Sequence, residues 1–165
     1  MKLHTALLAA IILTVAAPAL AHNGPASTGA LPVPANRIVG LWEAVATVRP
    51  CNIPAAPPRD VRNNLLFHAG GTVTENPGGL PNATGPSRSF GLGTWRYDPA
   101  SNRYTGMLRF DTYLNGVYTG YTTIDRNLVL AGGADTAVGP VVVTVYGTSG
   151  NQLIQLCGTA NQHRL

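Results

Sequence analysis

The chain has 165 residues, of which 45% are hydrophobic and 11% charged, a composition that predicts one compact folded domain and excludes a disordered chain. Its formal net charge of +4 reflects a scarcity of carboxylates, since Asp and Glu together number only 7. Lys2 is the single lysine, and the arginines are spaced singly along the chain. Singly spaced arginines do not form a stripe that follows phosphates, so no nucleic-acid partner is expected.

The first 21 residues have the three-part layout of a secretory signal peptide. A charged start at Lys2 precedes an apolar run over 6–20, and an Ala-Leu-Ala motif ends at Ala21. The alternative is a membrane anchor, but Pro18 interrupts the run, which has about 15 apolar residues where roughly 20 are needed to span a bilayer. We therefore predict cleavage after Ala21 and export, without a membrane anchor, to the periplasm or the medium of a bacterium.

Residues 22–36 are small, proline-rich and without periodicity, which predicts a flexible leader before a single domain over 37–165. Cleavage would make His22 the new amino terminus, and an N-terminal histidine with a second histidine can bind copper. That arrangement resembles secreted copper oxygenases that cut polysaccharides. Such a clamp needs a rigid base, whereas His22 heads the leader, so we expect no metal and no cofactor.

Cys51 and Cys157 are the only cysteines, an even number in a chain predicted to reach an oxidising compartment. A metal pair or a catalytic thiol are the alternatives, but metal ligands usually cluster at short spacing and neither cysteine has a histidine near it in sequence. We predict a structural disulfide that ties an early segment to the last strand. In the chain-entropy model, a loop of this length contributes roughly 4 to 5 kcal/mol as an upper figure.

From Arg37 onward the chain has the pattern of β-strands separated by turn residues, and no segment has helical periodicity over twelve residues. Two longer connections, over 50–58 and 76–88, are rich in proline or glycine. The predicted strands are Val39 to Val48, Asn64 to His68, Gly71 to Glu75, Ser89 to Tyr97, Arg103 to Tyr113, Val117 to Ile124, Asn127 to Ala131, Pro140 to Tyr146 and Gln152 to Cys157.

Short connections indicate that these strands follow one another in an antiparallel meander. Such a sheet must hide its two edges, and closing it into a barrel does so completely. The predicted fold is therefore all-β, a single antiparallel meander barrel of about 8–10 strands. A sandwich of two sheets is the competing architecture.

Two Gly-x-Trp motifs stand on predicted strands, at 40–42 and at 93–95. The first resembles the signature of the calycin superfamily, which includes lipocalins, fatty-acid-binding proteins and avidins. The stretches 93–97, 108–110 and 157–160 resemble small secreted bacterial calycin-like proteins of unassigned function. The resemblance implies structural roles at the closed barrel end for Gly40 and Trp42, with Arg164, or as second choice Arg126, across the indole.

A barrel of this size can enclose one small ligand between its inward side chains. Strand alternation places the more apolar of the two faces of the 103–113 strand inward. It likewise places one face of the 89–97 strand inward. If Arg96, Arg109 or Arg126 faces inward, it could hold a ligand carboxylate, although an outward ion pair such as Arg109–Asp111 is the favoured alternative. The aromatic rings could instead simply fill a small core. The candidate ligand-binding residues are Phe67, Trp95, Tyr97, Tyr104, Phe110, Tyr121 and Arg109.

These observations predict an exported barrel that binds a small hydrophobic or amphipathic molecule, with the 50–58 and 76–88 connections near the rim, where they could gate entry. No catalytic residue is assigned, because no histidine has a neighbouring nucleophile or carboxylate in sequence. Two alternatives remain open. One is a small barrel enzyme of cyclase or isomerase type, and the other is a filled-core interaction module that acts through its loops. The sequence does not indicate the oligomeric state.

Overall fold

The computed structural model describes residues 35–77 and 84–165. The predicted signal peptide and the leader up to residue 34 lie outside the described residues. Ala35 and Asn36, which the sequence analysis assigned to the leader, belong to a short 3-10 helix, η1 (Ala35–Ile38), that precedes the first strand. Among the described residues, no helix is long and apolar enough to cross a membrane.

Nine antiparallel strands follow η1 in chain order. They are β1 (Gly40–Pro50), β2 (Arg59–Phe67), β3 (Thr72–Asn76), β4 (Pro86–Arg88), β5 (Gly91–Asp98), β6 (Arg103–Leu114), β7 (Val117–Leu130), β8 (Thr136–Tyr146) and β9 (Gln152–Arg164).

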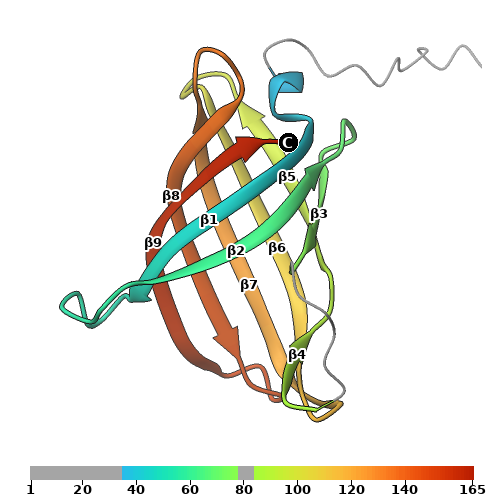
Figure 1. Cartoon of the computed structure of the whole chain (residues 1–165), viewed down its shortest axis with the longest axis vertical. Coiled ribbons are helices and arrows are strands. Elements are labelled where there is room, and N and C mark those ends of the chain that lie inside the picture. Colours follow the sequence, from blue (N-terminus) through green and yellow to red (C-terminus); the bar gives the residue numbers. More distant parts are fainter. Residues whose placement is uncertain (1–34, 78–83) are drawn as a thin grey trace, which may run out of the picture.

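Eight of these strands form a closed barrel in which sequence neighbours pair, from β1 through β9. The last strand, β9, pairs with β1 from Trp42–Arg164 to Pro50–Leu156, and this ladder closes the barrel. The short β4 pairs with the end of β6, beyond the part of β6 that pairs with β5. Figure 1 shows the strands wrapping around one axis, with the C terminus beside η1. The predicted single meander barrel is confirmed, and the two-sheet sandwich is wrong.

Alternation along the strands separates an enclosed face from an outer face, as a half-buried pleated strand requires. On β1, Trp42, Ala44 and Val48 are buried, while the residues between them are partly or fully exposed. On β6, Tyr104 and Leu108 are buried and Met107 is exposed, so the predicted inward face of that strand is confirmed.

Several predicted strand boundaries are wrong. One continuous strand, β7, replaces the two predicted strands Val117 to Ile124 and Asn127 to Ala131. The polar residues between them, Asp125 and Arg126, pair with β6 on one side and with β8 on the other. The last strand continues to Arg164, since it must span the barrel to pair with β1. β2 begins at Arg59, and the predicted 76–88 loop contains β4.

The predicted strand at Pro140 starts four residues earlier, at Thr136. The β7–β8 ladder passes from the Arg126–Val141 pair to the Val129–Val138 pair without a pair at Pro140. Proline has no N–H to donate, so it is tolerated where the ladder on that side is interrupted.

One end of the barrel is closed by Trp42, which is fully buried and donates from Nε1 to the Ile38 carbonyl over 2.7 Å. The Arg164 guanidinium lies 4.4 Å from the Trp42 ring and donates to the carbonyls of Val39 and Arg37. Gly40 has φ +132°, and a Cβ there would lie 2.6 Å from Arg164 Nη1. The Arg164–Trp42 contact implied by the resemblance is therefore present, and glycine at position 40 makes room for it.

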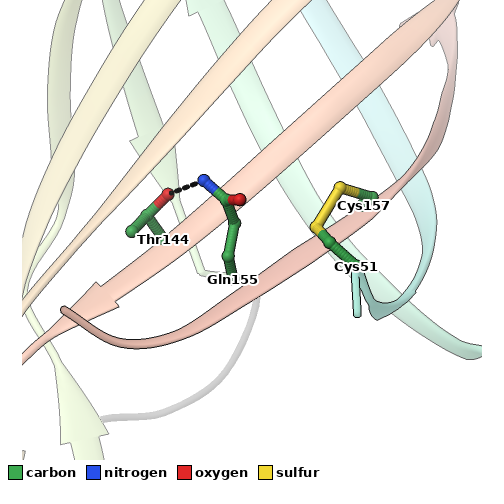
Figure 2. Close-up of a disulfide and its surroundings, with 4 residues drawn as sticks. All are labelled: Cys51, Thr144, Gln155 and Cys157. Atoms are coloured by element: carbon green, nitrogen blue, oxygen red, sulfur yellow. Dashed lines mark hydrogen bonds between the residues drawn. A yellow bond between two sulfur atoms is a disulfide. The ribbon is translucent and has the colours of Figure 1, made fainter. Parts of the chain in front are cut away.

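The predicted Cys51–Cys157 disulfide is present, with the two Cα atoms 5.0 Å apart (Figure 2). Cys51 directly follows β1 and its N–H donates to the Gln155 carbonyl of β9 over 3.0 Å. Gln155 also donates to Thr144 of β8 over 3.3 Å. The disulfide thus joins the first and last strands beside the ladder that closes the barrel.

Candidate functional site

The barrel interior has two halves of different character, which we name the closed half and the open half. The closed half, next to Trp42, is filled by apolar and aromatic side chains, and the space left among them is about 10 Å³. Trp95 contacts Phe67 edge-on, with ring centroids 6.1 Å apart, and lies at the same distance from Tyr104. These rings form a filled core and leave no space for a ligand between them inside the barrel.

The open half, toward the β6–β7 and β8–β9 connections, contains a cavity of about 180 Å³. At about 30 Å³ per water molecule, this is the volume of about six waters. The cavity reaches the surface at Arg59 and Val61, which are exposed. Its apolar side, the aliphatic wall, comes mainly from β1, β7, β8 and β9 and consists of Ala46, Val48, Ile124, Val141, Val143, Val145 and Leu156.

Apart from Thr122 and the exposed Arg59, four polar side chains line the other side of the same cavity and form what we call the polar cluster. They are Asn63 of β2, Glu75 of β3, Arg88 of β4 and Arg126 of β7. These positions are far apart in sequence, and the closure of the barrel brings them together. A cavity with one aliphatic and one charged wall matches a molecule that itself has an apolar and a polar part.

Glu75 is the most enclosed member of the polar cluster, with a fully buried side chain. Arg88 Nη1 donates to Glu75 Oε2 over 2.7 Å and Arg88 Nη2 donates to Oε1 over 3.3 Å. The Asn63 amide also donates to Oε1. Three donors therefore converge on the two carboxylate oxygens of Glu75 and fix its side chain in place.

Gly91 of β5 makes room for this carboxylate. A Cβ at position 91 would lie 2.6 Å from Glu75 Oε2 and 2.9 Å from Glu75 Cβ, closer than such contacts occur. The nearest part of Glu75 includes its Cβ, which cannot rotate away. The glycine therefore lets a buried carboxylate sit against the neighbouring strand.

Arg126 is the other enclosed charge, with only 6% of its surface exposed. Its Nε and Nη1 atoms are buried and have no hydrogen-bond partner among the described residues. Burial lowers the pKa of Arg126 to about 10, Glu75 opposes this shift and Arg88 adds to it. The guanidinium therefore remains charged at neutral pH. Its Nε and Nη1 donors find no acceptor among the described residues of the barrel.

The polar cluster contains two guanidinium groups and one carboxylate, so it carries one positive charge in excess, while Arg59 at the mouth of the cavity is exposed to solvent. Both terminal nitrogens of Arg88 already donate hydrogen bonds to Glu75. The Arg88 guanidinium also lies 4.2 Å from the centre of the Phe110 ring. Glu75 cannot neutralise both arginines. The uncompensated charge therefore belongs to Arg126.

The predicted ligand-binding residues separate into three groups. Phe110 lines the cavity, while Phe67, Trp95 and Tyr104 fill the closed half, where Tyr97 packs against Tyr104 at 4.9 Å. Two residues lie on the outer face and line no part of the cavity. Arg109 has a side chain 54% exposed, lies 3.7 Å from Asp111 and covers the Tyr121 ring at 3.9 Å. Arg109 and Tyr121 therefore do not bind a ligand inside the barrel, and Arg109 instead forms the outward pair with Asp111 that the sequence analysis favoured.

Asn63, Glu75 and Arg88 were not predicted from the sequence as site residues. Arg126 was considered only among the arginines that could face inward and as the second choice beside Trp42, where the structure instead has Arg164. A signal was present in the alternation. Glu75 falls on the same face as Val73, and Arg126 falls between Ile124 and Leu128 once β7 is read as one strand. A charged residue on the apolar face of an alternating strand is an enclosed charge, and enclosed charges concentrate at functional sites.

The fold and the site together define a closed eight-stranded antiparallel barrel with a small interior cavity that is charged on one side. No protein-family model matches the chain, and neither the curated proteins nor the solved structures compared with it include a significant match. Within 35–77 and 84–165, no three His, Cys, Asp or Glu side chains are grouped so as to hold a metal ion.

Proposed function

We propose that this protein is an exported carrier that binds a small amphipathic molecule inside the open half of its barrel. The observation that carries the proposal is the 180 Å³ cavity, which has an aliphatic wall facing a cluster of buried charges. Burial of apolar ligand surface contributes roughly 25 cal/mol per Å² before the costs of association. The small volume restricts the enclosed part of the ligand to a small molecule or a short chain.

Export is part of the proposal and rests on the signal-like residues 1–21 together with the disulfide. Disulfides persist in oxidising compartments, and the Cys51–Cys157 bond joins the strands that close this barrel. The calycin relationship is likewise proposed. It is supported by the contacts at the closed end, where the Arg164 guanidinium lies over the Trp42 ring and Gly40 makes room for it.

We favour a carrier over a small barrel enzyme because of the state of Glu75, the only carboxylate that lines the described cavity. Both of its oxygens accept hydrogen bonds from Arg88, and one also accepts from Asn63. A general base needs an oxygen within hydrogen-bond reach of the substrate, and protein donors already engage both Glu75 oxygens. The cavity also argues against a module with a completely filled core.

Native mass spectrometry of the mature protein, purified from its own compartment and compared with the denatured protein, tests the proposal. We expect a reproducible mass excess that disappears on denaturation. Val143→Phe, which fills part of the cavity, should abolish the excess, whereas Val138→Phe on the exposed face of the same strand should retain it. A mass without excess in the unaltered protein, or an equal excess in both variants, would contradict binding inside the barrel.

A further inference from the structure

Arg126 is a feature of the interior that a purely structural role does not explain. It is buried on β7, lines the cavity, and has two nitrogens without a partner among the described residues. Removing a guanidinium from water is costly unless its donors and its charge are compensated. Each such unmet group in a folded protein calls for a bound partner or another specific reason.

The protein's own carboxylate does not supply that partner. Glu75 is engaged by Arg88 and Asn63, and its side chain is fixed against Gly91. Water could occupy the cavity, but water is neutral and would leave the excess positive charge in place. The missing partner is therefore an anion, and one negative charge balances the polar cluster.

We propose that the interior site takes a small organic carboxylate, whose two oxygens accept hydrogen bonds from Arg126 while its apolar part lies against the aliphatic wall. The guanidinium fork and the carboxylate are matched planar groups that pair through two parallel bonds. A single excess charge matches a monoanion better than a phosphate, which carries close to two charges at neutral pH. This inference rests on the proposed function and names the class of ligand.

The test compares three probes with the same six-carbon tail and different head groups, namely hexanoate, hexan-1-ol and hexylamine. Each is titrated into the disulfide-bonded protein and followed by heteronuclear NMR, with shifts expected at Ile124, Arg126 and Val143. We expect hexanoate to bind at least tenfold more tightly than hexan-1-ol, and hexylamine to bind most weakly. Charge-assisted hydrogen bonds to a buried guanidinium account for a preference of that size.

The matched variants are Arg126→Met, which keeps most of the side-chain volume without the charge, and Arg109→Met on the outer face. Arg126→Met should lower the affinity for hexanoate at least tenfold and change that for hexan-1-ol less than twofold. Its melting temperature should not fall, because the variant removes an unpaired buried charge. Arg109→Met should bind all three probes as the unaltered protein does.

The outcomes separate this inference from the proposed function. Equal binding of hexanoate and hexan-1-ol in the cavity would overturn the carboxylate assignment and leave an interior carrier. Absence of any cavity shift with all three probes would overturn both. Retention of tight hexanoate binding by Arg126→Met would also overturn the assignment. If Arg126→Met does not fold, the comparison of hexanoate, hexan-1-ol and hexylamine on the unaltered protein still tests the carboxylate assignment.

Discussion

The closed and open halves of the barrel interior are enclosed by the same strands and differ in the side chains at their inward positions. In the closed half, Phe67, Trp95 and Tyr104 fill the space to within about 10 Å³. In the open half, smaller aliphatic residues leave about 180 Å³, and buried charges line one wall. The closed half contributes packing, and the open half keeps a cavity and an uncompensated charge. The part of the core that is filled by packing is therefore separate from the part in which we propose that a ligand binds.

The largest effect should come from the closed half. Trp42→Ala removes a fully buried ring, its hydrogen bond to Ile38 and the surface on which Arg164 lies. We expect the free energy of unfolding to fall by about 3 to 5 kcal/mol. Chemical denaturation measures this loss. Leu41→Ala, on the exposed face of the same strand, is the control, and an equally small loss in both variants would remove Trp42 from the core.

The next largest effect is expected from the disulfide beside the β1–β9 ladder, which closes the barrel around both halves. Replacing Cys51 and Cys157 together by alanine opens a connection between residues separated by 106 positions. We expect a loss of about 2 to 4 kcal/mol, because the unfolded chain gains conformational freedom. Urea unfolding of the double variant and of the reduced natural chain should agree. Identical midpoints for the oxidised and reduced chains would show that the β1–β9 ladder closes the barrel unaided.

A smaller effect is expected from the polar cluster of the open half. Glu75→Gln removes the only negative charge facing Arg88 and Arg126 among the described cavity residues. We expect destabilisation by about 2 to 3 kcal/mol, less than for a fully enclosed pair, because the Arg88 side chain is 19% exposed and can turn toward water. Thermal unfolding provides the measurement.

Glu43→Gln is the matched control for that experiment. Glu43 lies on the outer face, 3.6 Å from Arg62 and 2.9 Å from His163, with a side chain 31% exposed. Glu43→Gln should lower the free energy of unfolding by at most about 1 kcal/mol, as the loss of other surface ion pairs does. Equal losses for Glu43 and Glu75 would mean that the open half does not isolate its charges from solvent.

The smallest effect concerns the closed half at alkaline pH. Burial raises the pKa of Tyr104, and the neighbouring Tyr97 adds to this shift. The folded state then holds the phenolic proton more tightly than the unfolded chain, whose tyrosine pKa is about 10. The contribution of Tyr104 to the free energy of unfolding is therefore fully present below about pH 10. It decreases as the pH rises above that value. Tyr104→Phe should show a weaker decrease in denaturation experiments between pH 9 and 11, and an unchanged slope would contradict the shift.

Much of the fold was predictable because β-strands have a period of two residues. The alternation around Trp42 and Tyr104 predicted which faces are buried, and the two cysteines predicted the disulfide. The predictions failed where polar residues interrupt an apolar pattern. Asp125 and Arg126 were taken as a break between strands, whereas both lie in β7 and pair with its neighbours.

The sequence by itself determined the all-β class, the meander order, the disulfide and the inward faces of the most regular strands, because these depend on local alternation and on residue counts. Only the tertiary structure decided that Tyr121 lies outside and that Asn63, Glu75, Arg88 and Arg126 share one cavity. The physical reason is that the polar cluster joins β2, β3, β4 and β7, and no local pattern specifies such distances. Closure of the sheet into a barrel brings these residues together, and the same closure excludes the solvent that would otherwise compensate Arg126.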